Sequence, residues 1–259
     1  MEYKEILTAS QVMNRFLPEI KSKKHDPTKI LAGIFYVLIT GIQWRNLSKE
    51  YPPKSTCYYW FRKLSKIGAW KDTYQILFEI YAKHFNENLN TFVVDGTFVK
   101  AAMGGSKIGN TKVGKGTKVM QMVDKEGLLV SLHIDSANPH ESQLLIKTLK
   151  NSISHTMPKY ILGDRAYDSD KLDMKCKKMG VTLVAYHKLN RKNITQDGRE
   201  ARRLKKRYIV ERTNAHLKNY RKVNVRYERN PKLFEDFIWM AHCLIFIKKF
   251  NIHNDYLVA

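Results

Sequence analysis

Hydrophobic and polar residues follow two different periods along the chain, and the change between them falls near residue 88. Before that point, apolar residues recur every three or four positions, as in Val12, Met13, Phe16 and Ile20, which predicts amphipathic helices. After it, short apolar runs end at glycine or aspartate, which predicts β-strands. We therefore expect a helical domain over residues 1–88 and a second domain over residues 89–259.

The helical domain contains segments with clear start and stop signals. Asp26 and Pro27 form an N-cap and first-turn pair, which predicts a buried helix up to Thr40 that ends at Gly41. After the prolines at positions 52 and 53, Ser55 or its neighbour can cap a further helix that is rich in aromatic and basic residues. A helix, a turn and a second capped helix indicate an all-α domain of the helix-turn-helix type.

The second domain begins with three predicted strands. Residues 91–95 form an apolar run that ends in Asp95-Gly96, which indicates a strand entering a tight turn. Two further strands are joined by Asp124 to Gly127, whose composition predicts a hairpin. The chain then alternates between predicted helices (139–153, 168–179 and the segment around Glu211) and predicted strands (160–163 and 181–186). A basic insertion around residues 187–206 leads into the Glu211 helix, and further helices are expected at the C-terminal end. This order describes an α/β fold of the ribonuclease-H-like type, a mixed five-stranded sheet with flanking helices.

Three carboxylates occupy positions at which such a fold can gather them. Asp95 and Asp164 follow predicted strands, and Glu211 lies on a late helix. At about 100° per residue, one charged stripe of that helix comprises Arg207, Glu211, Asn214 and Lys218. Because catalytic groups in α/β sheets lie outside the strand ends, we expect the three side chains to converge. Oxygen ligands of this kind suit Mg²⁺ or Mn²⁺, and two such ions can clamp the attacking and leaving oxygens of a phosphodiester displacement.

Positive charge points to a polyanionic partner. The 259 residues carry 46 Lys and Arg against 24 Asp and Glu, a formal net charge of +22. Between positions 188 and 232 there are 16 basic and 4 acidic residues, so 12 of the 22 net charges lie there. So large an excess repels itself unless an anion balances it, which makes nucleic acid the expected partner. On the helix that Ser55 can cap, Arg62 and Lys63 are then candidate DNA contacts; the alternative is that the aromatic residues of this helix are bundle core.

Cysteine usage and hydropathy exclude other classes of protein. Cys57, Cys176 and Cys243 are odd in number and widely spaced, which argues against a disulfide framework and against a zinc site. No N-terminal run resembles a signal peptide, and the apolar run at residues 30–39 is too short to span a bilayer. We therefore expect a cytoplasmic, nucleoid-associated protein with no membrane partner.

Three blocks of the second domain form a recognisable set. They are Val94-Asp95-Gly96-Thr97, Gly163-Asp164-Arg165-Ala166-Tyr167-Asp168 and Arg207-x3-Glu211-x6-Lys218. In this order they resemble the DDE transposases of bacterial insertion sequences, in particular insertion-sequence family five. The family shows Tyr, Arg, Glu and Lys at fixed spacing in the third block, and here Leu204 stands at the Tyr position. Residues 41–47 also look like the family's N-terminal domain, so the resemblance covers nearly the whole chain.

The resemblance implies a DNA transposase that binds the terminal inverted repeats of its element, cleaves the ends and joins the 3′ ends to target DNA. Water would attack the phosphodiester at the element's end, and the freed 3′-hydroxyl would then attack the target. Because two DNA ends must be brought together, a homodimer or larger assembly on double-stranded DNA is implied, without a nucleotide cofactor. The residues implied as ligands of two Mg²⁺ or Mn²⁺ ions are Asp95, Asp164 and Glu211, and those implied as DNA contacts are Arg207, Lys218 and Arg165.

Two alternatives of other classes compete with this interpretation. The run Gly109-x4-Gly114-Lys115-Gly116-Thr117 resembles the phosphate-binding loop of nucleotide kinases, but that loop must follow an apolar strand and open a helix. A repressor or captured transposase, which binds DNA without cutting it, is the second alternative.

Other carboxylates compete for a place in the site. Asp135, just past the third strand, is a credible alternative member. Asp124 is better explained by its hairpin turn, and Asp168 by capping a helix.

Overall fold

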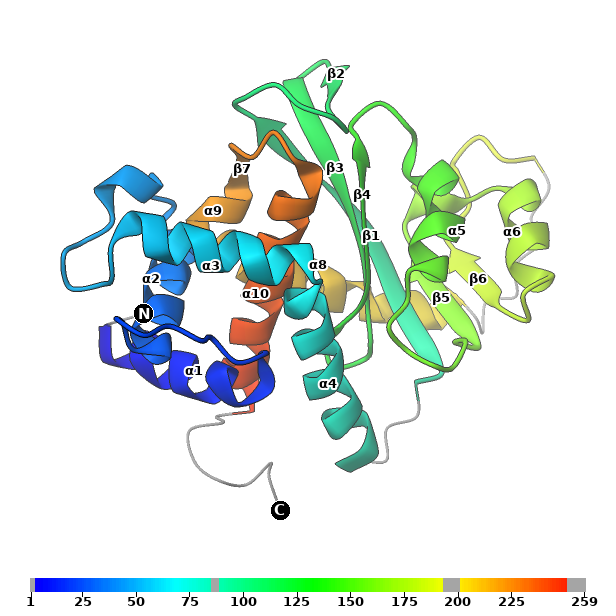
Figure 1. Cartoon of the computed structure of the whole chain (residues 1–259). Helices are drawn as coiled ribbons and strands as arrows, with labels where there is room; N and C mark the ends of the chain where they lie inside the picture. Colours follow the sequence, from blue (N-terminus) through cyan, green and yellow to red (C-terminus); the bar gives the residue numbers. More distant parts are fainter. Residues whose placement is uncertain (1–2, 85–88, 193–200, 251–259) are drawn as a thin grey trace. The chain divides into compact units, whose positions relative to one another are not determined.

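A computed structural model describes residues 3–84, 89–192 and 201–250, and the chain divides into two compact units (Figure 1). One unit combines residues 1–87 with 216–259, and the other comprises residues 88–215. The expected domain boundary at residue 88, and residues 193–200 of the basic insertion expected around 187–206, lie outside the described residues. No helix in the described part of the chain has the length and apolar character needed to cross a membrane.

The first unit is helical. Its elements are α1 (Tyr3–Phe16), α2 (Pro27–Thr40), the 3₁₀ turn η1 (Trp44–Asn46), α3 (Lys54–Lys66), α4 (Ala69–His84), α9 (Arg221–Asn224), β7 (Val225–Arg226) and α10 (Pro231–Lys249). The predicted boundaries of α2 are confirmed, because the Asp26 side chain accepts a hydrogen bond from the Thr28 amide and Gly41 ends the helix with a φ of 70°. A positive φ of this size is the usual conformation of a C-terminal glycine cap.

The segment before α3 differs from the expected turn. Residues 41–53 separate α2 from α3, more than the three or four residues of a helix-turn-helix turn. α3 also begins at Lys54 after an N-cap at Pro53, and no side chain caps it, so Ser55 does not have the predicted capping role. The helical character of the N-terminal region is confirmed, and a DNA-reading role of α3 stays a prediction.

The C-terminal helix α10 belongs to the helical unit, whereas the sequence placed it with the sheet. α10 is apolar on nearly every side, and a helix of this kind is stable only when neighbours surround it. Its Phe237 ring stacks on Phe61 of α3 at a centroid distance of 4.5 Å, and its Trp239 ring lies 5.5 Å from Tyr74 of α4. The division of function between residues 1–88 and 89–259 stays a prediction.

The second unit contains the sheet. Its elements are β1 (Thr91–Ala101), β2 (Gly109–Thr111), β3 (Gly114–Val123), β4 (Leu129–Ser136), α5 (Glu141–Lys150), β5 (Tyr160–Gly163), the 3₁₀ turn η2 (Arg165–Tyr167), α6 (Asp170–Lys177), β6 (Thr182–Ala185), the 3₁₀ helix η3 (Arg202–Arg207) and α8 (Tyr208–Lys218), whose last residues are counted with the helical unit.

The strands of this unit form a mixed sheet. β3 pairs antiparallel with β1, β4 and the short β2, whereas β5 pairs parallel with both β1 and β6. Along the five longer strands the order is therefore β4-β3-β1-β5-β6. The predicted mixed α/β fold with flanking helices is confirmed.

One prediction about β1 is wrong, because Asp95-Gly96 is not a turn. β1 continues to Ala101 and pairs with β3 as far as Lys100, opposite Gly116. Residues 97–99 are Thr, Phe and Val, which favour strands and outweigh the local turn signal. The parallel pairing with β5 ends earlier, at Val93 opposite Leu162. Asp95 therefore lies beyond the end of the parallel pairing, in a strand that β3 still holds.

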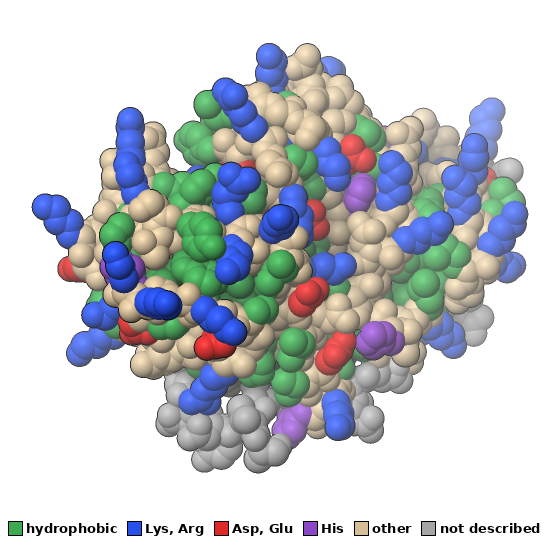
Figure 2. Space-filling model, viewed as in Figure 1, with side chains coloured by type: hydrophobic (Ala, Val, Ile, Leu, Met, Phe, Trp, Pro, Cys, Tyr) green, Lys and Arg blue, Asp and Glu red, His purple; other side chains and the backbone are tan. Residues whose placement is uncertain are grey.

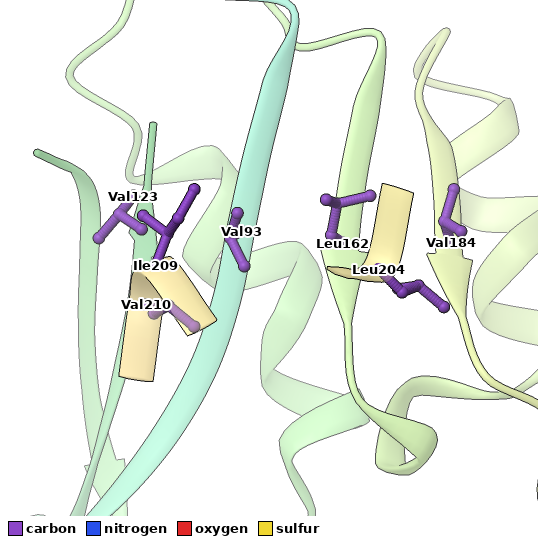
Figure 3. Close-up of a cluster of buried hydrophobic side chains, with 7 residues drawn as sticks. All are labelled: Val93, Val123, Leu162, Val184, Leu204, Ile209 and Val210. Carbon is purple, nitrogen blue, oxygen red and sulfur yellow. The ribbon is translucent and has the colours of Figure 1, made fainter. Parts of the chain in front are cut away.

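A buried apolar cluster covers one face of the sheet (Figure 3). Four strands and the η3–α8 segment contribute its side chains, which are Val93, Val123, Leu162, Val184, Leu204, Ile209 and Val210. Leu204, which stands at the family's Tyr position, is 3% exposed. A leucine suits this apolar place because it has no hydroxyl that would need a hydrogen-bond partner.

Two sequence interpretations concern loops around β3. The hairpin turn is confirmed: the Asp124 carboxylate accepts hydrogen bonds from the amides of Glu126 and Leu128 at 2.9 and 2.8 Å. The phosphate-loop interpretation is wrong, because Gly109 pairs with Gly116 between β2 and β3. A paired strand that continues to Val123 cannot offer its amides to a phosphate at a helix start.

Candidate active site

Asp95 and Asp164 come from neighbouring parallel strands. In the register of β1 and β5, Val93 lies opposite Leu162, and each aspartate follows two residues later. Asp164 directly follows β5 and accepts a hydrogen bond from the Ala166 amide at 2.8 Å, which caps η2. Because both strands run in the same direction, the two carboxylates lie at the same edge of the parallel part of the sheet.

Asp95 is oriented by a residue of α8. The side-chain amide of Asn214 donates to the Asp95 carboxylate at 2.8 Å, and the Asn214 carbonyl oxygen accepts from the Gln121 side chain at 2.5 Å. Gln121 is fully buried and lies opposite Asp95 in the register of β1 and β3. This chain of hydrogen bonds links β3, α8 and β1, and it fixes the direction of the Asp95 carboxylate.

Glu211 is the most exposed of the three predicted carboxylates. Its side chain is 57% exposed and forms an ion pair with Arg207 at 3.0 Å, one helical turn earlier. A pair of this kind contributes about 0.2–0.5 kcal/mol to helix stability. Arg207 ends η3 and Glu211 lies in α8, so the predicted stripe of charged residues crosses the junction of the two helices.

Electrostatic interactions connect the three carboxylates. Burial raises the pKa of Asp95, the Gly96 amide lowers it, the charge of Asp164 raises it, and Arg207 and Glu211 act with smaller and opposite effects. The structure thus places Asp95 within reach of the charges of both Asp164 and Glu211. Their repulsion is the condition under which a cation is most strongly attracted.

A fourth carboxylate, which the sequence interpretation missed, lies beside them. Glu141 is the first residue of α5, and its side chain covers Gly96, where an added Cβ would lie 2.6 Å from the Glu141 carboxyl carbon. The Tyr167 hydroxyl donates to this carboxylate at 3.2 Å. Burial raises the pKa of Glu141, and the charges of Asp95 and Asp164 raise it further. The glycine directly after Asp95 was the signal that could have indicated a close neighbour.

The predicted DNA contacts occupy different parts of the chain. Arg165 is exposed and directly follows Asp164, and Arg207 pairs with Glu211, so both belong to the sheet unit. Lys218 is exposed at the end of α8 and belongs to the helical unit. Arg62 and Lys63 are exposed on α3, where Figure 2 shows Lys and Arg side chains standing out from the surface.

The competing carboxylates have other partners. The Asp135 carboxylate lies 3.4 Å from the His133 imidazole and 3.7 Å from the Lys147 ammonium group, so its charge is paired within its own surroundings. Asp168 does not cap α6, because the N-cap is Ser169. Instead, the Asp168 carboxylate accepts hydrogen bonds from the Lys188 amide at 2.8 Å and from the Arg191 side chain. Asp168 therefore anchors the segment that follows β6.

The sequence profile described as "Transposase DDE domain" matches residues 87–246, which is more than half of the chain. The chain belongs to this DDE transposase family. A second profile, "Putative transposase of IS4/5 family", matches residues 10–74. The resemblance found in the three sequence blocks and in the N-terminal segment is thereby confirmed.

Individual relatives of this DDE transposase chain are distant. The "Putative transposase for insertion sequence element IS402" of Burkholderia cepacia is 28% identical over 138 residues, which are 50% of this chain and 62% of that protein. Among solved structures, the synaptic complex of the piggyBac transposase with hairpin DNA aligns with a TM-score of 0.49 and 10% identity over 96% of this chain and 72% of that one. The catalytic core of BIV integrase aligns with a TM-score of 0.31 and 12% identity over 51% and 68%.

DDE transposases use divalent metal ions, and the chemistry of the carboxylate site fits such an ion. Its donors are oxygen atoms, which Mg²⁺ and Mn²⁺ prefer. The pKa of Asp95 is raised mainly by burial and further by the Asp164 charge, and a bound cation would offset both effects. Among the described residues, no three His, Cys, Asp or Glu side chains already stand in the arrangement of a metal site. Glu211 pairs with Arg207, and its side chain is the most exposed of the three carboxylates.

Proposed function

We propose that this protein is a DNA transposase that binds the terminal inverted repeats of its element, cleaves the DNA ends and joins the 3′ ends to target DNA. Its catalytic residues are Asp95, Asp164 and Glu211. The observation that carries the proposal is the position of Asp95 and Asp164, each two residues beyond the paired Val93 and Leu162, together with the effect of the Asp164 and Glu211 charges on Asp95.

The three carboxylates would hold two Mg²⁺ or Mn²⁺ ions. When bound, two such ions activate the attacking oxygen and stabilise the leaving oxygen of a phosphodiester displacement. The chain's own contribution is orientation: Asn214 fixes the Asp95 carboxylate, and the Ala166 amide fixes that of Asp164. Arg207, beside Glu211, and Arg165, beside Asp164, place positive charge where a DNA phosphate would approach, and Lys218 adds a further phosphate contact.

Recognition of the DNA ends is assigned to the helical unit. A surface hollow of about 650 Å³ lies along α3 and the first turn of α10, and its lining residues are Ser55, Tyr58, Tyr59, Arg62, Lys63, Ser65, Lys66, Asn230, Lys232 and Leu233. The Lys63 ammonium group lies 4.5 Å from the centre of the Trp60 ring, which holds this flexible side chain against the helix. Basic groups beside exposed tyrosines suit a phosphate backbone and the base edges next to it.

Joining of two ends to one target requires at least two active sites on the DNA, so we propose a homodimer or larger assembly. The segment between positions 188 and 232, with 12 net positive charges, offers the electrostatic attraction for the second duplex.

A cleavage assay on the full chain tests this function. The substrate is duplex DNA with the inverted repeats that flank the gene, and we expect nicks at the element ends only when Mg²⁺ or Mn²⁺ is present. Asp164→Asn should bind this DNA and leave it intact. Asp170→Asn is the matched control, because Asp170 is an exposed carboxylate on α6 that pairs with Arg191. Binding of the unchanged protein without any cleavage would instead indicate a repressor or captured transposase.

A further inference from the structure

Glu141 and Tyr167 form a buried pair next to the three carboxylates of the proposed site. Tyr167, the last residue of η2, is 0% exposed, and its hydroxyl donates to the Glu141 carboxylate. Glu141 is the first residue of α5, so the pair connects the start of α5 to η2.

Two glycines provide the space for this pair. A Cβ at Gly96 would lie 2.6 Å from the Glu141 carboxyl carbon, and a Cβ at Gly163 would lie 2.6 Å from the Tyr167 ring. Gly96 directly follows Asp95, and Gly163 directly precedes Asp164. The backbone next to each catalytic aspartate therefore accepts one member of the Glu141–Tyr167 pair in direct contact.

A purely structural role explains this arrangement poorly. A carboxylate in the first turn of a helix interacts favourably with the helix dipole, but Glu141 lies within the field of the Asp95 and Asp164 charges, and those charges oppose its own. The positive charge of Lys118, on β3, offsets part of this repulsion. The Lys118 ammonium group also donates to the Pro139 carbonyl oxygen. A neutral glutamine could fill the same space without the repulsion, so the charge itself requires an explanation.

We propose that Glu141 is a fourth carboxylate of the active site, which helps to bind the divalent cation held by Asp95 and Asp164, and that Tyr167 is its positioning residue. The inference rests on the proposed function, because it assigns an additional ligand to the same cation. Tyr167 acts by holding the Glu141 carboxylate over Gly96. Among the described hydrogen bonds to acidic residues of the site, the Tyr167 hydroxyl donates to Glu141 alone.

The test measures Mn²⁺ binding by the full chain without DNA, by isothermal titration calorimetry, for five variants beside the unchanged protein. Glu141→Gln keeps the size of the side chain and its ability to accept the Tyr167 hydrogen bond, but removes the charge. We expect its affinity for Mn²⁺ to fall at least about tenfold, and that of Tyr167→Phe to fall about tenfold as well, as is typical when a supporting hydrogen bond to a ligand is lost. Glu126→Gln, at an exposed residue of the β3–β4 turn, and Tyr186→Phe, an exposed tyrosine after β6, are the matched controls and should bind as the unchanged protein does.

A melting curve of each variant separates this role from a structural one. Without metal, Glu141→Gln should melt at the same or a higher temperature than the unchanged protein, because a repelling charge is gone, and Mn²⁺ should raise its melting temperature less. A lower melting temperature without metal, together with unchanged Mn²⁺ affinity, would show that Glu141 only supports the fold and would overturn the inference.

Asp95→Asn distinguishes failure of this inference from failure of the proposed function. If Asp95→Asn abolishes Mn²⁺ binding and Glu141→Gln leaves it unchanged, the cation site stands and Glu141 has no part in it. If the unchanged protein shows no saturable Mn²⁺ binding, both the two-ion function and the role of Glu141 are refuted.

Discussion

Replacement of Glu211 by glutamine separates the catalytic role of this residue from its role in a surface ion pair. The change keeps the size of the side chain and its helix propensity, and removes the charge that would bind a divalent ion. In the structure this charge faces Arg207 at 3.0 Å and contributes to the field at Asp95. The two roles predict effects of very different size.

The structural effect is small. The Glu211 side chain is 57% exposed, so loss of the pair with Arg207 costs at most about 0.5 kcal/mol. For a chain of this length, that corresponds to a change of about 1–2 °C in melting temperature. The catalytic effect is large, because the loss of a metal ligand removes several kcal/mol of transition-state stabilisation. We expect the cleavage rate to fall about a thousandfold or more, which corresponds to about 4 kcal/mol.

Three measurements on the same preparation decide between these roles: the rate of nicking in Mg²⁺, the affinity for inverted-repeat DNA in a gel-shift titration, and the melting curve. The expected result is a folded protein that binds the ends as tightly as before, or slightly more tightly, and does not cut. If Glu211→Gln is folded, binds and still cuts near the normal rate, Glu211 has no place in the site and Glu141 becomes the leading candidate for the third carboxylate.

Three further predictions concern the positioning of Asp95, the DNA contacts and the helical core. Asn214→Ala removes the donor that lies 2.8 Å from Asp95, so single-turnover nicking should slow about 10–100-fold at unchanged DNA affinity; a normal rate would show that Asp95 needs no such support. Arg62→Ala combined with Lys63→Ala should make the negative slope of log K against log[salt] shallower by about 2 if each residue neutralises one phosphate. An unchanged slope would place the contact elsewhere. Burial raises the pKa of Asp236 to about 6, so its ionisation destabilises the folded state, and its contribution to stability falls as pH rises from about 4 to about 6. In urea unfolding, Asp236→Asn should therefore gain stability relative to the unchanged protein across this interval, by on the order of 2 kcal/mol, and a constant difference would refute the assigned pKa.

Several features of this fold follow from local patterns and could be predicted. The α2 helix has its cap and its terminal glycine in the sequence, and β5 is a short apolar run before Asp164. The hairpin turn at Asp124 depends on hydrogen bonds between near neighbours, which turn composition encodes directly. Elements of this kind are determined within a few residues, so periodicity and turn chemistry suffice.

Other features depend on partners that are distant in the sequence. The placement of α10 with the helical unit results from aromatic contacts such as Phe61 with Phe237, which no local pattern of α10 specifies. Asp168 has the spacing of a helix cap, yet its actual partners follow β6, about twenty residues later. The hydrogen bond from Asn214 to Asp95 joins residues even farther apart, so the sequence could place Asn214 on the same helix as Glu211 but could not give it a role.

Gly96 shows how one residue type can support two opposite interpretations. Asp-Gly is a strong turn signal because glycine adopts a positive φ without strain, and this led to the prediction that β1 ends at Asp95. In the structure Gly96 has no positive φ and pairs with Met120 inside the strand. The glycine is needed instead for the missing Cβ, whose place the Glu141 side chain occupies. From the sequence alone, a glycine that a turn requires cannot be distinguished from a glycine that close packing requires. Only the strand pairing on both sides of Gly96 distinguishes the two. Because that pairing also keeps Asp95 within a rigid strand, the same error in the sequence interpretation concealed both the support of Asp95 by β3 and the presence of Glu141 beside it.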